Sequence, residues 1–220
     1  MRVSLCVICG NEAEHIIAML SSFAPVFDEL CIVRAIGAKE ADATLEMAAA
    51  WCRENRPDLH WACPQLPPSP REAIALCEGL LAEAPIDTWT VLGSSMGGFY
   101  ATVLHQRHGL PAVLINPAVA PARDLAAHIG EQQTWHRPED RFFFRPEYVA
   151  ELQSMTQPGL RDPARVLAVL ATGDEVLSFA EMAERYAGAR QHVVHGSDHA
   201  LSDFEQHLPV VLDFIGLHRP

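Results

Sequence analysis

The sequence predicts an α/β fold: a mostly parallel, doubly wound sheet in a single domain that spans residues 1–220. Short apolar runs rich in β-branched residues alternate with segments of helical period along most of the chain. This alternation is typical of a parallel sheet with helices on both faces. A length of 220 residues is enough for one such domain with a large core, and no repeat or low-complexity linker divides the sequence.

Three strands and two helices are expected in the first third of the chain. The strands are the short apolar runs at residues 3–9, 29–34 and 60–63. Between them, residues 12–22 and 42–55 carry apolar side chains at the spacing of an amphipathic helix. We therefore expect a β-α-β-α-β start in which the strands lie parallel.

A proline-rich turn follows and leads into a clearly marked helix. Prolines at positions 64, 67 and 68 exclude regular structure there, since proline lacks an N–H and restricts the residue before it. Ser69 is the expected N-cap, Pro70 the first helical residue, and Glu72 the capping-box partner of Ser69. This pattern predicts a helix that runs to about residue 83.

The rest of the chain is organised around the stretch Gly93-Ser94-Ser95-Met96-Gly97. It joins an expected strand at residues 88–93 to an expected helix at 96–108. In that setting G-x-S-x-G forms a nucleophile elbow, a strained turn that exposes its serine. Gly93 and Gly97 leave room for the turn because neither has a Cβ. The alternative is an ordinary glycine–serine loop between a strand and a helix.

The frame of the motif makes Ser95, rather than Ser94, the expected nucleophile. Its hydroxyl is expected at the N-terminus of the helix, where free N–H groups and the helix dipole favour a developing oxyanion. The backbone N–H of Met96 is the oxyanion donor that the turn itself is expected to supply.

Residues 117–160 interrupt the alternation after a further expected strand at 112–115. Prolines divide this region into short pieces that we expect to be helical, and aromatic side chains concentrate in it. An insertion at this point of a doubly wound sheet lies over the carboxyl ends of the strands, where ligands bind. We predict a small helical cap or lid there. The alternative is a helical excursion that only packs on the core.

The alternation resumes with expected strands at residues 166–171 and 191–194 and a helix at 180–186 between them. A last helix is expected within residues 204–217. Pro209 lies near the start of that helix or kinks it.

Asp174 and His199 each follow one of these strands, at the sheet edge where functional loops collect. The chain order Ser95, Asp174, His199 is that of an α/β-hydrolase triad. A serine hydroxyl becomes a good nucleophile when a histidine takes its proton, and a carboxylate holds that imidazole in the right tautomer. Glu175 and Asp198 are competing acids, although Asp198 is adjacent to the histidine and poorly placed to contact its ring.

The sequence contains neither H-E-x-x-H nor H-x-x-E-H, so we expect no metal and no cofactor, and the other histidines are expected at the surface. All six cysteines lie within the first 77 residues. Cys6 and Cys9 have C-x-x-C spacing, but on a strand these positions point to opposite faces. We expect all six to pack as reduced, small apolar side chains in a cytoplasmic protein.

The net charge of −12 argues against nucleic acid and anionic membrane surfaces as partners. The sequence shows neither a secretory signal pattern nor an apolar run of membrane-spanning length. We therefore expect no membrane association. The oligomeric state is left open.

The segments of the chain that are similar to a known family are residues 63–68 (CPQLPP), 93–102 (GSSMGGFYAT), 110–119 (LPAVLINPAV), 172–177 (TGDEVL) and 198–200 (DHA). Through them the chain resembles, from about residue 51 to its C-terminus, the YqiA-like esterases, which are small α/β-hydrolases with little cap structure. The resemblance implies hydrolysis of a small-molecule carboxylic ester, with short acyl chains preferred. It also implies Ser95, Asp174 and His199 as the triad.

Residues 1–50 depart from that family, which opens with a strand running into His-Gly-Phe and a serine-rich loop that supplies the second oxyanion donor. In this chain residues 9–14 (CGNEAE) and 27–33 (FDELCIV) instead resemble the start of a family-two glycosyltransferase. Such transferases bind a nucleotide-sugar and hold a metal with a later D-x-D, a motif that this sequence lacks. Gly10 and Asn11 are the candidates for the second oxyanion donor.

The sequence thus predicts a serine esterase that hydrolyses carboxylic esters through a Ser-His-Asp triad. One alternative is a nucleotide-sugar glycosyltransferase remnant. The other is a non-catalytic binding protein with an α/β-hydrolase fold.

Overall fold

The computed structural model of the chain describes residues 4–9, 29–34, 61–62, 66–134 and 137–214. The helices expected at residues 12–22 and 42–55 lie outside these residues, as do Gly10 and Asn11.

Within the described residues, seven parallel strands form one sheet in the order β3-β2-β1-β4-β5-β8-β9. The strands are β1 (Ser4–Cys9), β2 (Glu29–Arg34), β3 (Trp61–Ala62), β4 (Trp89–Ser94), β5 (Ala112–Ile115), β8 (Val166–Ala171) and β9 (Arg190–Val194). All lie within one residue of the ranges that the sequence predicts. The chain winds outward from β1 to β3, returns to β4 on the other side of β1, and winds outward again to β9. The predicted doubly wound parallel sheet is confirmed.

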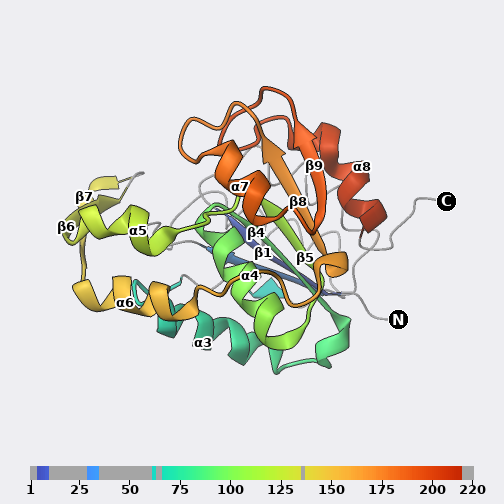
Figure 1. Cartoon of the computed structure of the whole chain (residues 1–220). Helices are drawn as coiled ribbons and strands as arrows, with labels where there is room; N and C mark the ends of the chain where they lie inside the picture. Colours follow the sequence, from blue (N-terminus) through green and yellow to red (C-terminus); the bar gives the residue numbers. More distant parts are fainter. Residues whose placement is uncertain (1–3, 10–28, 35–60, 63–65, 135–136, 215–220) are drawn as a thin grey trace.

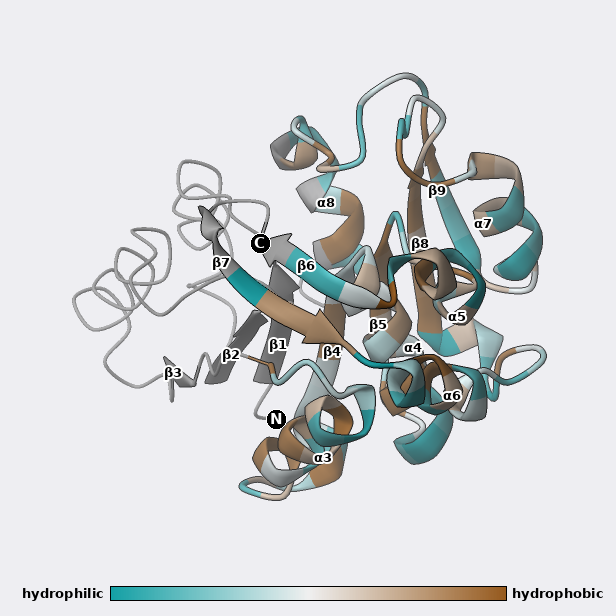
Figure 2. Ribbon diagram, turned by 90° about the vertical axis from the view of Figure 1, so that its left-hand side faces the viewer, coloured by the Kyte–Doolittle hydropathy of each residue, from teal (hydrophilic) through white to brown (hydrophobic). Residues whose placement is uncertain are grey.

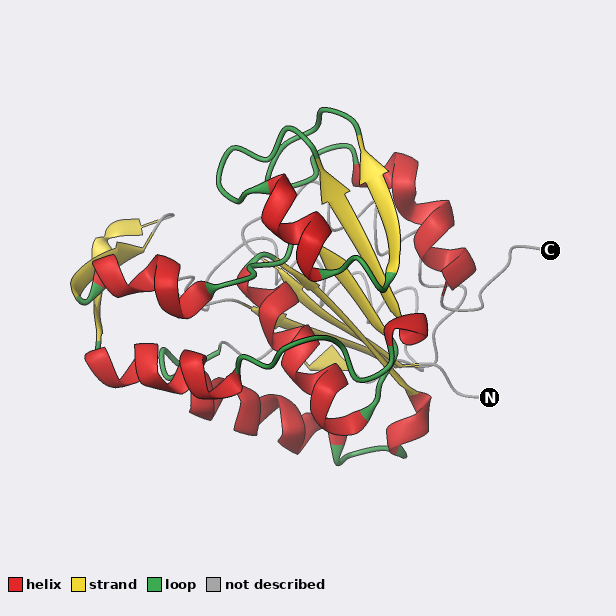
Figure 3. Ribbon diagram, in the orientation of Figure 1, coloured by secondary structure: helices red, strands yellow, loops and turns green. Residues whose placement is uncertain are grey.

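The central strands are buried on both faces, which explains their continuous apolar sequence. Every residue of β5 and of β8 is buried, as expected for parallel strands covered by helices on both sides. The main helices around the sheet are α3 (Pro70–Leu81), α4 (Met96–His108), α7 (Phe179–Arg185) and α8 (Phe204–Phe214). Figure 2 shows α8 on one side of β8 and β9 and α7 on the other, and Figure 3 shows the layers. Among the described residues, no helix has both the length and the apolar character needed to cross a membrane.

The N-cap and the first residue of helix α3 are those that the sequence predicts. The hydroxyl of Ser69 accepts a hydrogen bond from the backbone N–H of Glu72 at 3.3 Å, and Pro70 is the first helical residue. The helix ends at Leu81, two residues before the predicted end. Glu151 of α6 (Pro146–Met155) also contacts this helix start, which no local pattern predicts. It accepts from Oγ of Ser69 at 2.7 Å and from the N–H of Arg71 at 3.0 Å. A carboxylate is favoured at a helix N-terminus, so this contact attaches α6 to α3.

Residues 117–160 contain an antiparallel hairpin, which corrects the expectation of helical pieces alone. Helix α5 (Pro121–Leu125) is followed by β6 (Gly130–Thr134), β7 (Arg137–Phe144) and then α6. In β7, Phe144 is buried while Phe143 is 58% exposed. This alternation has the two-residue period of a strand. The prediction of short helices instead rested on the positions of the prolines. The hairpin stands off the main sheet, on the side to which the carboxyl ends of the strands point (Figures 1 and 2).

His105 of α4 is fully buried, so the expectation that the remaining histidines lie at the surface is wrong here. Its Nδ1 is 2.6 Å from the carbonyl of Leu110, and its Nε2 is 3.3 Å from the backbone N of Asp162. Because a carbonyl only accepts and an amide N–H only donates, these partners assign a neutral ring with its proton on Nδ1. Burial lowers the pKa of His105 below its ordinary value.

We expect this histidine to make the protein less stable in mild acid. The unfolded chain takes up a proton at His105 near pH 6.5, whereas the folded chain resists it until lower pH. The unfolded state therefore binds more protons in this window, and the free energy of unfolding falls as the pH drops below about 6.5, by at most about 1.4 kcal/mol per pH unit. The measurement is urea unfolding between pH 5 and 8 for the unmodified protein and His105→Gln. The difference in unfolding free energy between the two should shrink in acid, and parallel curves would contradict the assignment.

Candidate active site

Ser95 occupies a strained turn between β4 and α4. Its φ is +54° and its ψ −122°, and α4 begins at the next residue. The sequence allows this turn through glycines. A Cβ on Gly93 would overlap the carbonyl group of Gly97, and a Cβ on Gly98 would lie 2.6 Å from the Cβ of Pro117. Such a positive φ at a non-glycine residue, held by tight packing, is typical of functional turns.

The backbone of Ser95 is fixed from both sides. Its N–H donates to the carbonyl of Ile115 at 3.0 Å, and its carbonyl accepts from the N–H groups of Phe99 at 3.2 Å and Ala118 at 3.0 Å. The bonds with Ile115 and Ala118 connect the turn to the end of β5 and the residues after it, and the bond from Phe99 connects it to α4, so the hydroxyl of Ser95 is presented by a rigid support.

The structure brings Ser95, Asp174 and His199 together from three separate parts of the chain. Nε2 of His199 lies 2.9 Å from Oγ of Ser95, and Nδ1 of His199 lies 2.8 Å from Oδ2 of Asp174. The carboxylate of Asp174 is fully buried, while 20% of the His199 side chain is exposed. An ionised carboxylate accepts from Nδ1–H, which leaves the lone pair of Nε2 facing the serine hydroxyl. This arrangement can remove a proton from Ser95.

Asp174 is itself held by the loop that follows it. Its Oδ1 accepts from the N–H of Val176 at 2.8 Å and from the N–H of Leu177 at 2.7 Å. One carboxylate oxygen is thus used for the loop and the other for His199. The division keeps Oδ2 directed at the imidazole.

The two competing acids do not contact the ring of His199 in this way. Glu175 accepts from the backbone N–H of His199 at 2.9 Å. Asp198 accepts from the N–H and the hydroxyl of Ser202 at 2.9 and 2.7 Å, and the hydroxyl bond lowers the pKa of this carboxyl. Both carboxylates therefore shape the loop around the histidine.

The expected oxyanion donors are described only in part. Met96 is the first residue of α4, where N–H groups have no partner within the helix. Gly10 and Asn11 lie outside the described residues. The strand that precedes them, β1, is paired with β4, and Ile8 is opposite Gly93. The end of β1 therefore lies beside the turn that carries Ser95.

The sequence reasoning gave no role to Asn116, which is fully buried beside this group. Its side chain donates to the backbone of the loop that carries His199. The sequence does contain a signal for such a role. Asn116 directly follows the buried strand β5, and Asp174 likewise lies shortly after the end of β8. A polar residue at the carboxyl end of a parallel strand is a candidate for a site on that ground alone.

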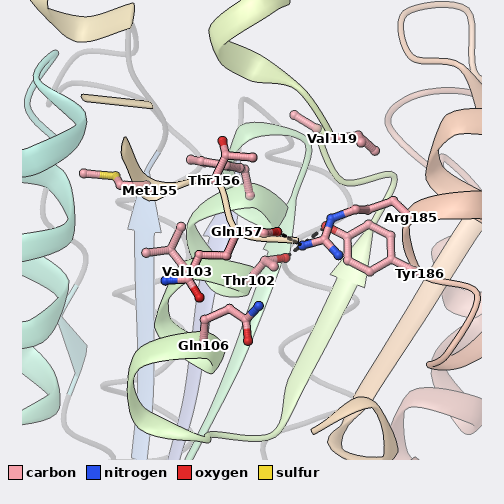
Figure 4. Close-up of a pocket in the computed structure, with 11 residues that line it drawn as sticks. Thr102, Val103, Gln106, Val119, Met155, Thr156, Gln157, Arg185 and Tyr186 are labelled. Atoms are coloured by element: carbon pink, nitrogen blue, oxygen red, sulfur yellow. Dashed lines mark hydrogen bonds between the residues drawn. The ribbon is translucent and has the colours of Figure 1, made fainter. Parts of the chain in front are cut away.

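A small pocket lies beside α4, and Ser95, Asp174 and His199 are not among the residues that line it (Figure 4). It is lined by Thr102 and Gln106 of the helix, by Met155 and Gln157, and by Arg185 at the end of α7. Arg185 donates to the carbonyls of Gln157 and Gly159 at 3.0 and 2.9 Å and closes one side. The closed part has room for about one water molecule, so we do not assign a substrate to it.

Solved structures with the same architecture define the fold of this protein. A structure from a study of the metagenome-derived lipolytic enzymes LipS and LipT has a TM-score of 0.58 and 15% identity, over 99% of this chain and 95% of that one. The esterase domain of a Rhodothermus marinus protein has a TM-score of 0.53 and 15% identity, over 96% and 86%. Mouse alpha/beta hydrolase domain-containing protein 10 has a TM-score of 0.53 and 12% identity, over 95% and 88%. The chain has the α/β-hydrolase fold.

The family follows from the sequence. A family model for UPF0227, described as an uncharacterised protein family, matches residues 40–216. The chain belongs to this family, that of the YqiA-like esterases. The predicted resemblance is thereby confirmed, and the match begins about ten residues before the point at which we placed it. The likeness of residues 1–50 to a glycosyltransferase stays a prediction.

Proposed function

We propose that the protein is a serine esterase that hydrolyses small carboxylic esters, with Ser95 as nucleophile, His199 as general base and acid, and Asp174 as the carboxylate that orients His199. The observation that carries this proposal is the position of the His199 ring, which lies within hydrogen-bond distance of both Oγ of Ser95 and Oδ2 of Asp174. The family and the fold of the neighbours support the same reaction class.

The first half of the reaction acylates the serine. Nε2 of His199 takes the proton of the Ser95 hydroxyl as Oγ bonds to the ester carbonyl carbon, and the carbonyl oxygen becomes an oxyanion. The N–H of Met96 donates to that oxyanion, with a second donor from the chain after β1, for which Gly10 and Asn11 are the candidates. The carbonyl re-forms, the C–O bond to the alcohol breaks, and the leaving oxygen takes the proton from Nε2.

The second half regenerates the enzyme. A water molecule gives a proton to Nε2 of His199 and attacks the acyl carbon, forming another oxyanion in the same place. When this intermediate breaks down, Oγ of Ser95 leaves and takes the proton back. The carboxylic acid is released, and neither a metal nor a cofactor takes part in any step.

Residues 117–160 are proposed to act as a cap over this site within a single domain. The hairpin β6–β7 and the helices α5 and α6 lie on the side to which the carboxyl ends of the strands point (Figure 1), where ligands bind in doubly wound sheets. A preference for short acyl chains is part of the proposal and rests on the resemblance to the YqiA-like esterases.

Covalent labelling tests the proposal most directly. A fluorophosphonate is expected to add one phosphonyl group per chain, detected by intact mass, and peptide mapping should place the adduct on Ser95. Ser95→Ala is the control and should remain unlabelled. Labelling at another residue, or no labelling of a protein that is shown to be folded, would count against the catalytic function and favour a non-catalytic binding protein.

A further inference from the structure

Asn116 follows β5 directly and has a fully buried side chain. Its φ is +39°, in the left-handed region that asparagine tolerates better than most residues. Its backbone N–H donates to the carbonyl of Val169 in the neighbouring strand β8 at 3.0 Å. A buried amide in an uncommon backbone conformation is retained only where its surroundings require it.

The side chain of Asn116 makes three hydrogen bonds. Its Nδ2 donates to the carbonyls of Asp198 and His199, at 3.1 and 3.0 Å. Its Oδ1 accepts from the N–H of Ala171 at 2.8 Å. The partners assign the orientation of the amide, because the two carbonyls can only accept and the N–H can only donate. Both N–H bonds of the amide and its oxygen are therefore in use.

These contacts connect all three residues of the proposed triad. The two carbonyls belong to the peptide groups on either side of the Cα of His199. Ala171 is the last residue of β8, three positions before Asp174. The peptide that joins Ile115 to Asn116 accepts the N–H of Ser95. The backbone near each of the three functional side chains is thus hydrogen-bonded to Asn116 or to the peptide group that precedes it.

We propose that Asn116 is a positioning residue that places the imidazole of His199 between Ser95 and Asp174; this rests on the proposed function. The ring of His199 is attached to a single Cα, and Asn116 fixes the peptide groups on both sides of it. Without those bonds the loop can shift while the fold remains. A displacement of about 1 Å in a catalytic group costs about 10²-fold in rate.

Asn116→Asp and Asn116→Gly test this role. Aspartate keeps the shape but replaces both N–H donors with an oxygen that faces two carbonyls, and glycine keeps the backbone conformation without the amide. We expect kcat for p-nitrophenyl butyrate to fall by about 10²-fold in each variant, with KM changed by less than about threefold, since Asn116 is fully buried and out of reach of a substrate. The rate of fluorophosphonate labelling should fall in parallel.

The matched control is Thr102→Val. Thr102 is also buried, and its hydroxyl bonds to the carbonyl of Gly98 at 2.8 Å and the hydroxyl of Tyr186 at 3.0 Å. Its loss removes buried hydrogen bonds from α4 without touching the His199 loop. We expect a lower melting temperature and an unchanged kcat.

A second readout separates positioning from general destabilisation. In a His199→Ala background, Asn116→Asp should cause no further loss of the residual activity, because there is no imidazole left to position. The positioning role would be overturned by any of three results. The first is that Asn116→Asp lowers kcat as much in the His199→Ala background as in the unmodified protein. The others are an unchanged kcat in both Asn116 variants, or failure of both variants to fold. Each of these outcomes leaves the esterase proposal intact, whereas a Ser95→Ala variant with full activity would remove the proposed function itself.

Discussion

Ser95→Ala is expected to lower kcat for p-nitrophenyl butyrate by about 10⁶-fold, the loss seen when a triad serine is removed. The alanine methyl group cannot attack the ester, so only oxyanion binding and proximity remain. The variant should fold normally. The substitution removes the hydrogen bond between Oγ of Ser95 and His199, but the backbone hydrogen bonds that hold the turn remain. The measurement is steady-state hydrolysis together with thermal unfolding.

The neighbouring serine supplies the control for this experiment. Ser94 ends β4 on the same turn, and Ser94→Ala makes the same chemical change one residue away. We expect it to keep activity within about tenfold of the unmodified protein, since the elbow motif exposes only its central serine. Equal losses in the two variants, or a Ser95→Ala variant with more than a tenth of the activity, would contradict the assignment.

Asp174→Asn is expected to lower kcat by about 10³- to 10⁴-fold. Oδ1 of Asp174 holds the N–H groups of Val176 and Leu177, and the amide oxygen of asparagine can still accept them. The amide NH₂ then faces Nδ1 of His199 and favours the tautomer with its proton on Nε2. That tautomer cannot take the proton of Ser95, so the variant keeps the arrangement of the three side chains but loses activity.

Glu175→Gln is the matched control, because it removes a carboxylate charge from the adjacent residue. Glutamine can still accept the backbone N–H of His199, as Glu175 does at 2.9 Å. We expect a loss of less than about tenfold. If Glu175→Gln abolished activity while Asp174→Asn did not, the roles of the two acids would have to be exchanged. Labelling by the fluorophosphonate should slow in Asp174→Asn and not in Glu175→Gln.

The local elements of the fold could be predicted from the sequence because their signals are local. The strand of residues 112–115 is a short apolar run, and the helix at Ser69-Pro70 carries its own cap. The glycines of the motif specify a turn whose steric demand the structure bears out at Gly93. Backbone preference and short-range hydrogen bonding decide these features.

The sheet order and the cap depended on contacts between distant segments. No periodicity indicates that β1 lies beside β4, or that the chain between α5 and α6 forms a hairpin. In the sequence, His105 looks like a polar residue on the exposed face of a helix. Its buried, neutral state depends on hydrogen bonds with the backbone of Leu110 and Asp162.

The site divides in the same way. The sequence by itself determined the residue types, their chain order and the turn at Ser95, because that turn is built from five consecutive residues. Only the tertiary structure decided that His199 reaches both Ser95 and Asp174, that Glu175 and Asp198 contact the loop rather than the ring, and that Asn116 joins the three. The physical reason is that these residues follow different strands of a parallel sheet, and hydrogen bonds between them exist only once the sheet has assembled.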